Sequence, residues 1–314
     1  MKPVYFNHDG GVDDLVSLFL LLQMEEIELI GVSAIGADSY IEPAVSASEK
    51  IIQRFGYQPI EVAASKARGK NPFPKEWRMH AFFVDALPVL NEHYETNDKD
   101  ITTHVEAYQD IIDKVTQSEE PVTLLFTGPL TDLAQALTAD PTITSQIERL
   151  VWMGGTFLDK GNVEEPEHDG TAEWNAFWDP EAVATVFNSD IEIDMVALES
   201  TNQVPLTWEV RQMWARERQY IGVEFLRVSY AAMPPLTHFQ TNSTYFLWDV
   251  LTTAYTGEAS LAHKHTVKAS MVTEGPSQGR TYIDETEGRL VGVVDDVNRD
   301  DFFRYITDLA KKAE

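Results

Sequence analysis

The sequence contains no cysteine among its 314 residues, and it has few basic residues for its acidic content. The absence of cysteine excludes disulfide bonds and metal sites built from thiolates. Lysine and arginine number 24 against 51 aspartate and glutamate residues, so the formal net charge is −27. A charge of this size repels polyanions, and we therefore expect no nucleic acid and no anionic membrane among the partners.

Two kinds of segment are also missing. No positively charged stretch followed by an apolar run opens the chain, as a secretory signal would, and the apolar runs are too short to span a bilayer. We therefore expect a cytoplasmic protein. No linker, internal repeat or low-complexity tract divides the sequence, so we expect residues 1–314 to form a single domain with a large core.

The chain does contain an alternation of predicted strands and helices. Apolar runs bounded by turn residues predict strands at residues 4–6, 27–35, 61–64, 122–126, 150–153, 191–198, 266–272, 280–283 and 290–294. Apolar positions at helical spacing predict helices at residues 43–54, 101–118, 207–218, 220–231 and 300–311. This order predicts an α/β fold with an open, mostly parallel central sheet covered by helices on both faces.

The most informative stretch is the acidic loop, Asn7-His8-Asp9-Gly10-Gly11-Val12-Asp13-Asp14. It follows a predicted strand and leads into a helical pattern, so Asp9 stands at a strand's carboxyl end and Asp13 and Asp14 at a helix N-terminus. Ordinary turn and N-cap roles would explain each aspartate singly. Three carboxylates this close repel one another, however, and a hard cation such as Ca²⁺ or Mg²⁺ would relieve the repulsion.

Polar residues also follow other predicted strands. Asp38, Thr127 and Met153 each stand at or just beyond the end of an apolar run. The carboxyl ends of parallel strands meet at one edge of a sheet, where ligands bind in open α/β folds. We therefore expect these residues to lie near Asp9, although they are far apart in the sequence.

The spacing of the acidic loop excludes two familiar sites. An EF-hand loop beginning at Asp9 needs glycine at its sixth position and glutamate at its twelfth, where Asp14 and Leu20 stand. An aspartyl nucleophile two residues before a second aspartate needs a carboxylate in place of Asn7. A Mg²⁺-dependent phosphohydrolase stays open as an alternative, although we can place no basic cluster for a phosphate beside the loop.

A third alternative uses a single Ca²⁺ ion. The ion would hold and polarise a water molecule while Asp9 removes the proton of that water as general base. Attack of the water on a sugar carbon, through a transition state that resembles an oxocarbenium ion, would hydrolyse a glycosidic bond.

Several motifs taken in order resemble those of the nucleoside hydrolases, which cleave the N-glycosidic bond of nucleosides to a free base and ribose. The acidic loop is similar to the family signature D-x-D-x-G-x-D-D, except that Asn7 stands in place of the first aspartate. The similarity continues at residues 127–131, 153–155, 161–163, 173–175 and 248–249. It covers nearly the whole chain.

Three features resemble the purine-specific (inosine-adenosine-guanosine) branch of that family: the segment 71–78, the long loop that ends at residues 169–175, and Trp248 directly before Asp249. In the branch that also accepts pyrimidines, the position of Trp248 is typically histidine. The resemblance therefore implies Ca²⁺-dependent hydrolysis of purine ribonucleosides, with a small purine nucleoside as the ligand. By analogy it also implies a homodimer.

Carried over position by position, the resemblance implies a role for each site residue. Asp9 would be the general base. The ligands of Ca²⁺ would be Asp9, Asp14, Asp249 and the main-chain carbonyl of Thr127. The ribose would be bound by Asp13, Met153, Asn162, Glu173, Asn175 and Asp249. The purine would lie between Trp77 and Trp248, with Asp38 at its edge.

Four further residues have expected roles of other kinds. Trp174 either contacts the ribose or packs in the core. His8 is expected to pack behind the site, and Asp132 to be a solvated helix residue. Residues 238–245 occupy the place of a mobile lid in relatives, and Tyr245 is our candidate for closing over the substrate.

Asn7 is the clearest departure from the family signature. An amide can donate and accept hydrogen bonds but adds no negative charge behind the metal, so its effect on metal affinity is open. A nucleoside-binding protein that is impaired in catalysis is therefore a further alternative.

Overall fold

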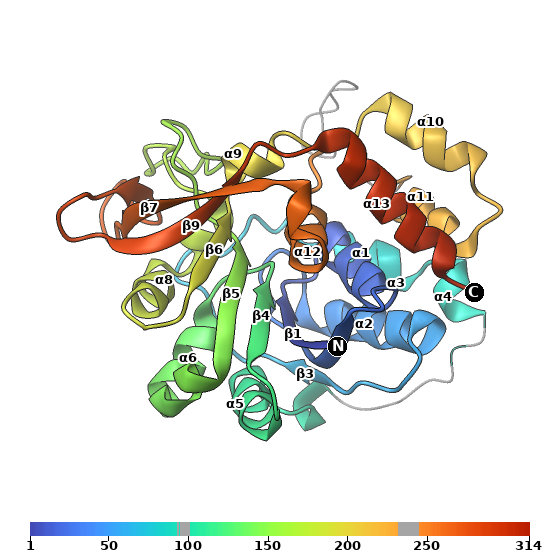
Figure 1. Ribbon diagram of the computed structural model, residues 1–314, viewed down its shortest axis with the longest axis horizontal. Coiled ribbons are helices and arrows are strands. Elements are labelled where there is room, and N and C mark those ends of the chain that lie inside the picture. The colour runs from blue at the N-terminus through green and yellow to red at the C-terminus, as the bar shows by residue number, and fades with distance from the viewer. Residues whose placement is uncertain (93, 95–100, 232–244) are drawn as a thin grey trace.

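The computed structural model describes residues 1–92, 94, 101–231 and 245–314, and its centre is a nine-stranded sheet (Figure 1). The strands are β1 (Lys2–His8), β2 (Ile27–Ala34), β3 (Val62–Ala64), β4 (Val122–Phe126), β5 (Ile147–Met153), β6 (Ile193–Val196), β7 (His263–Met271), β8 (Thr281–Ile283) and β9 (Arg289–Asp295). Their order is β3-β2-β1-β4-β5-β6-β9-β7-β8. Neighbours from β3 through β9 pair in parallel, and β7 is antiparallel to β8 and β9.

Helices cover both faces of this sheet (Figure 1). One face carries α1 (Val12–Leu21), α2 (Ile41–Phe55), α11 (Ile221–Ala231), α12 (Trp248–Gly257) and α13 (Arg299–Lys312). The other face carries α5 (Ala107–Gln117), α6 (Thr131–Ala139) and α8 (Pro180–Phe187). Because successive side chains of a strand point to opposite faces, Val4 and Phe6 of β1 pack in the core on the α1 face, and Tyr5 packs in the core on the α5 face. The predicted α/β fold is thus confirmed.

The remaining elements connect these layers or lie at their margins. They are α3 (His80–Asp85), α4 (Pro88–Asn91), α7 (Trp174–Trp178), α9 (Leu198–Thr201), α10 (Trp208–Arg216) and the 3₁₀ turns η1 (Ile101–Thr103), η2 (Pro141–Gln146) and η3 (Ala259–Leu261). Strands from both ends of the chain share the one sheet, which supports our proposal of a single domain.

One predicted helix begins later than expected. The helical pattern at 101–118 starts as the turn η1, and α5 begins only at Ala107. The intervening residues pair with the sheet instead, since Glu106 forms a parallel bridge with Ala64 and the amide of Ala64 donates to the carbonyl of Val105 at 2.9 Å. Pairing with the edge strand β3 therefore overrides the local helical pattern.

The strand order reverses at β1. The chain proceeds to β2 and β3 on one side of β1, and to β4, β5 and β6 on the other. In open α/β sheets this reversal leaves room for a ligand beyond the carboxyl ends of the two central strands. Asp9 follows β1 directly, and Thr127 follows β4 directly. The predicted site residues of these two strands therefore flank the switch point.

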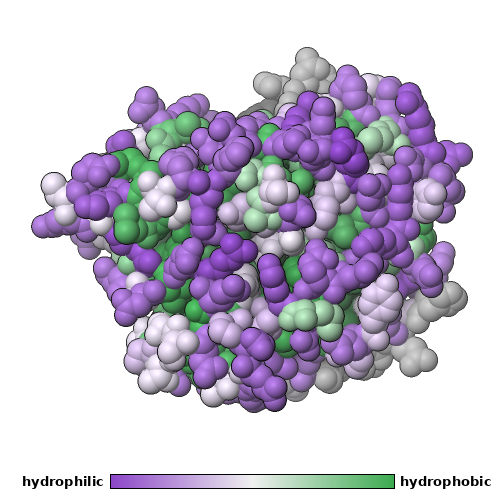
Figure 2. All heavy atoms as spheres, in the orientation of Figure 1, coloured by the Kyte–Doolittle hydropathy of each residue, from purple (hydrophilic) through white to green (hydrophobic). Residues whose placement is uncertain are grey.

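The surface is mainly hydrophilic. Figure 2 shows a face on which hydrophilic side chains dominate and apolar residues form small separate patches. Trp208 on α10 and Leu290 on β9 are among the exposed large apolar side chains. Among the helices of the described residues, none combines the length and the apolar character needed to cross a bilayer.

The acidic loop depends on a glycine, and a matched pair of variants tests this. Gly10 has φ +85°, and a Cβ there would lie 2.6 Å from the Cβ of Ala44. Gly275 has φ +80° but no atom within 4 Å of such a Cβ. Positive φ costs an L-residue about 1–2 kcal/mol, and overpacking about 1–3 kcal/mol more. We expect Gly10→Ala to lower the unfolding free energy more than Gly275→Ala in denaturant titrations. Equal losses would contradict close packing at Gly10.

Candidate active site

Four aspartates form a buried acidic cluster at the switch point, and we use this name for Asp9, Asp13, Asp14 and Asp249. Asp9 follows β1, Asp13 and Asp14 lie in the first turn of α1, and Asp249 lies in the first turn of α12. Their exposed fractions are 3%, 2%, 1% and 8%. Helix N-termini favour negative charge, so the ends of α1 and α12 partly compensate for this burial.

Backbone and hydroxyl groups donate to the cluster. The carboxylate of Asp14 accepts hydrogen bonds from the amide of Gly11 at 2.7 Å and from Oγ1 of Thr127 at 2.5 Å. The carboxylate of Asp13 accepts from the amide of Asp249 at 3.0 Å and from the hydroxyl of Tyr245. The cluster is therefore joined to β4 and to the segment before α12.

The cluster holds more negative charge than its surroundings compensate. Burial raises the pKa of Asp13 to about 6 and that of Asp14 to about 7, from an ordinary value of 3.8. Burial, and then the charges of neighbouring aspartates, also raises the pKa of Asp9 and of Asp249. Among the described residues, no lysine or arginine forms an ion pair with these four carboxylates.

The donor set fits a hard cation, because it offers carboxylate and carbonyl oxygens, the ligands that such a cation prefers. The carbonyl of Thr127 accepts a hydrogen bond from Nδ2 of Asn175 at 3.1 Å. In the part of the chain that the structure describes, no three acidic or histidine side chains converge as a complete metal cage. The ligand roles of Asp9, Asp14, Asp249 and Thr127 therefore stay predictions.

Two of the predicted ribose-binding residues lie at the ends of β4 and β5. Nδ2 of Asn175 donates to the carbonyls of Thr127 and Met153, each at 3.1 Å. Glu173 is the N-cap of α7, and its carboxylate accepts from the amides of Asn175 at 2.8 Å and Gly155 at 2.9 Å. These bonds place the start of α7 against the ends of both strands.

Asn162 is joined to Trp174. Oδ1 of Asn162 accepts from the amide of Trp174 at 3.0 Å, and its carbonyl accepts from Nε1 of the same residue at 3.1 Å. The ring of Trp174 is buried, stacks on Phe73 at 4.8 Å and meets Trp77 edge-on at 5.4 Å. Trp174 thus packs against Phe73 and Trp77, and a contact with ribose stays untested. Within the described residues, Asn162 has no hydrogen bond to the acidic cluster.

The two tryptophans predicted to hold a base have separate supports. Trp77 is half-buried against Phe73 and Trp174. Trp248 begins α12 and contacts Tyr245, with ring centroids 4.8 Å apart. Over the described ranges, no ring contact joins Trp77 to Trp248. A purine between them stays a prediction.

Asp38 does lie beside the acidic cluster, and it brings with it a histidine that the sequence did not reveal. The amide of Asp38 donates to Asp9 at 3.3 Å, and Nδ1 of His80 lies 3.4 Å from the carboxylate of Asp38. Burial lowers the pKa of His80, but Asp38 together with the charges of Asp13 and Asp14 outweighs burial, so that the pKa is raised from 6.5. The only available signal was the position of His80, two residues after the segment 71–78.

The predictions for His8 and Asp132 had different outcomes. His8 is fully buried, with Nε2 at 3.1 Å from Oγ of Ser48, which confirms a packing role. The expectation of a solvated Asp132 is wrong. Asp132 is fully buried and accepts hydrogen bonds from Nδ2 of Asn7 at 3.0 Å and Oγ of Ser65 at 2.6 Å, because the first turn of α6 packs behind β1.

Tyr245 reaches the cluster from the segment before α12. Its hydroxyl donates to Asp13, and its ring lies 5.7 Å from that of Tyr230, whose buried hydroxyl has no hydrogen-bond partner among the described residues. The rest of the expected lid, residues 238–244, lies outside the described residues. Closure of Tyr245 over a substrate stays a prediction.

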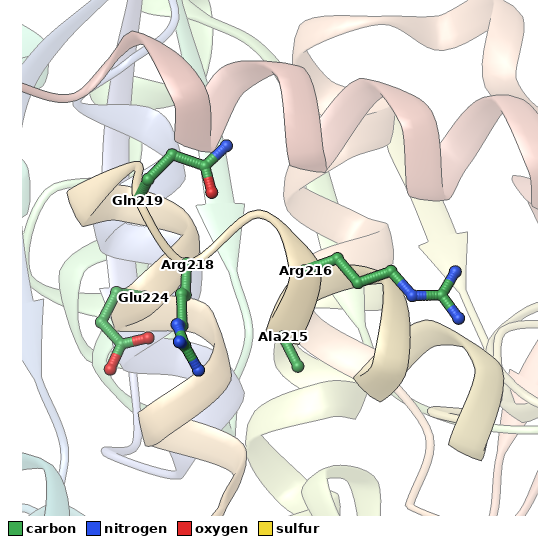
Figure 3. Close-up of a pocket in the computed structure, with 5 residues that line it drawn as sticks. All are labelled: Ala215, Arg216, Arg218, Gln219 and Glu224. Carbon is green, nitrogen blue, oxygen red and sulfur yellow. The ribbon is translucent and has the colours of Figure 1, made fainter.

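A separate pocket lies at the turn between α10 and α11 (Figure 3). Its lining residues are Ala215, Arg216, Arg218, Gln219 and Glu224. None of the predicted site residues lines this pocket, and none of its residues belongs to a strand. The acidic cluster is therefore the candidate active site.

The pKa of Asp13 predicts a pH-dependent stability. Its carboxyl keeps a proton up to about pH 6 when folded but only to about 3.8 when unfolded, so it destabilises the fold as pH rises through this window. Burial lowers the pKa of His8 to about 3, so His8 makes the fold more stable as pH rises. The effect of Asp13 is therefore measured as the difference between a variant and the native protein, in which the contribution of His8 cancels. We expect the stability of Asp13→Asn relative to native protein to increase by on the order of 1–3 kcal/mol from pH 4 to 7. Urea unfolding with chelator measures this, and a constant difference would contradict it.

Comparison with known proteins identifies the family. A family model described as inosine-uridine preferring nucleoside hydrolase matches residues 4–304. The crystal structure of an inosine-uridine preferring nucleoside hydrolase from Bacillus anthracis is 62% identical, with a TM-score of 0.91 and 100% of each chain covered. A purine-preferring ribonucleoside hydrolase from Gardnerella vaginalis is 25% identical, with a TM-score of 0.79 and coverage of 99% of this chain and 100% of that chain.

Curated relatives agree with the family but match over less of their length. The inosine-uridine preferring nucleoside hydrolase of Leishmania major is 30% identical over 67% of this chain and 65% of that protein. The probable uridine nucleosidase 1 of Oryza sativa subsp. japonica is 29% identical over 64% of this chain and 60% of that protein. The match thus spans less than two thirds of either relative. The resemblance seen in the motifs is confirmed, and the chain belongs to the nucleoside hydrolase family.

Proposed function

We propose that this protein hydrolyses the N-glycosidic bond of purine ribonucleosides, with Ca²⁺ as its metal. The observation that carries the proposal is the buried acidic cluster, which pairs with no lysine or arginine among the described residues and lies at the switch point of a nucleoside hydrolase fold. In the reaction the bond between C1′ of the ribose and the base nitrogen breaks, the oxygen of water joins C1′, and the base leaves with a proton.

The metal would be held by the carboxylates of Asp9, Asp14 and Asp249 and by the carbonyl of Thr127. All three carboxylates are buried, and Thr127 already contacts Asp14 through its hydroxyl. When bound, Ca²⁺ supplies the positive charge that keeps these carboxylates ionised and makes a water molecule more acidic.

We assign the role of general base to Asp9. It stands where β1 ends, and its carboxylate accepts the amide of Asp38 at 3.3 Å, which fixes one oxygen. As general base, the carboxylate of Asp9 would accept the proton of the attacking water. Because Asp9 also belongs to the metal ligand set, its loss removes two functions together.

The ribose would be bound by residues around the cluster: Asp13, Met153, Asn162, Glu173, Asn175 and Asp249. Each oxygen of Asp13 accepts one donor, from Tyr245 or from the amide of Asp249, and each has a second lone pair that can accept a sugar hydroxyl. Asn175 is anchored through Nδ2 on the carbonyls of Thr127 and Met153, which directs its oxygen elsewhere. These anchors support a preformed sugar site.

The base would lie between Trp77 and Trp248, with Asp38 at its edge. Each aromatic pair contributes about 0.5–1.5 kcal/mol beyond burial, so two rings favour the larger purine surface. Uridine is the second candidate substrate, because the 62% identical protein is described as inosine-uridine preferring. Direct comparison of substrates decides between them.

One test of this function concerns the general base Asp9 and the metal. We expect Asp9→Ala to lower kcat for inosine by at least about a thousandfold, since base and metal ligand are both lost. Chelator should abolish the activity of the native protein, and added Ca²⁺ should restore it and raise the melting temperature. Release of ribose from inosine is the measurement. Full activity after metal removal would contradict the mechanism, and phosphate release from nucleotides would favour the phosphohydrolase alternative.

A second test of this function concerns the two tryptophans that would stack on the nucleobase. Trp77→Leu and Trp248→Leu should each raise KM for inosine by about tenfold, with a smaller effect on uridine, because a smaller ring loses less stacking. Trp208→Leu is the matched control, since Trp208 is 68% exposed on α10 and should leave both substrates unaffected. Native turnover of uridine equal to that of inosine would contradict purine specificity. Binding of inosine without ribose release would favour the impaired binding protein.

A further inference from the structure

Asn7 and Asp132 form a buried hydrogen-bonded pair behind the acidic cluster. Asn7 is the next-to-last residue of β1, Asp132 lies in the first turn of α6, and both are fully buried. Nδ2 of Asn7 donates to Asp132 at 3.0 Å and to Oγ of Ser33 at 2.8 Å. The other oxygen of Asp132 accepts from Oγ of Ser65 at 2.6 Å. Each oxygen of Asp132 therefore has a neutral donor.

The contact needs a hydrogen-bond donor on one side chain and an acceptor on the other, which an amide facing a carboxylate provides. A carboxylate only accepts hydrogen bonds, whereas an amide both donates and accepts. An aspartate in place of Asn7 would set two buried carboxylates about 3.0 Å apart, with no proton donor between them. An amide and a carboxylate in the opposite order would satisfy the same contact. The N-terminus of α6 favours negative charge on its own side.

The pair lies directly behind the residues of the proposed site. The carbonyl of Asn7 accepts the amide of Thr127 at 3.0 Å, and Asp9 is two residues further along the chain. Thr127 in turn donates through Oγ1 to Asp14 at 2.5 Å. A change in the separation of Asn7 and Asp132 would therefore move the end of β1 relative to the end of β4.

We propose that Asn7 and Asp132 act as one amide–carboxylate pair that positions Asp9 and Thr127, and that the two side chains can be exchanged. In this chain the amide of the pair stands on β1 and its carboxylate stands on α6. Asn7 is thus half of a pair rather than a missing charge. The positioning role rests on the proposed function, whereas the pairing rests on the hydrogen bonds alone.

A double-mutant cycle tests the pair, using Asn7→Asp, Asp132→Asn and the variant that carries both changes. Asn7→Asp should lower the melting temperature and reduce kcat/KM for inosine by at least about tenfold, because two carboxylates then face each other. Asp132→Asn should have a smaller effect, since its amide oxygen still accepts from Asn7. The exchanged variant should return to within about threefold of the native kcat/KM.

Two further measurements separate positioning from simple packing. Asn7→Asp should weaken Ca²⁺ binding in titration calorimetry and lower kcat more than it raises KM, and the exchange should restore both. Losses that add in the exchanged variant would overturn the pairing. Recovery of melting temperature without recovery of Ca²⁺ affinity and kcat would overturn the positioning role. If native protein hydrolyses no nucleoside, the proposed function fails, while the melting temperatures of the cycle still decide the pairing.

Discussion

Negative charge held out of water, at the point where the strand order reverses, is the constraint on which this structure depends. Four carboxylates share that place, and burial alone would disfavour their ionised forms. The surrounding chain responds with backbone amides, a tyrosine hydroxyl, a threonine hydroxyl and two helix N-termini. These groups are oriented by α1, α12 and β4, so the arrangement of helices around the sheet is also the arrangement of donors around the charge.

The fold and the centre of the site were predictable from local patterns. Strands buried on both faces leave continuous apolar runs, and a carboxylate directly after such a run lies at the edge of the sheet. The same pattern predicts that Asp9, Asp38 and Thr127 lie together, and in the structure Asp38 contacts Asp9 while Thr127 contacts Asp14. The prediction succeeded because the period of a parallel strand and the place where it ends are both properties of a few adjacent residues.

Features that depend on distant partners were not predictable. Asp132 has the spacing of a solvated helix residue, and only the packing of α6 behind β1 gives it Asn7 as a donor. The start of α5 was displaced because residues 105 and 106 pair with β3, which no periodicity records. His80, the first residue of α3, meets Asp38 only after α3 has packed beside the loop that follows β2. The motifs indicate which residues have functional side chains, whereas only the tertiary structure shows which residues those side chains contact.

The hydrogen bond from the amide of Asp249 to Asp13 joins residues 236 positions apart. Bringing such distant segments together costs loop-closure entropy, which is recovered only when the intervening sheet and helices have formed. An early fragment of the chain that already contains Asp9, Asp13 and Asp14 therefore still lacks the fourth carboxylate. Any ligand that needs all four would bind only after the C-terminal part has been synthesised and docked, so its binding would report completion of the whole fold.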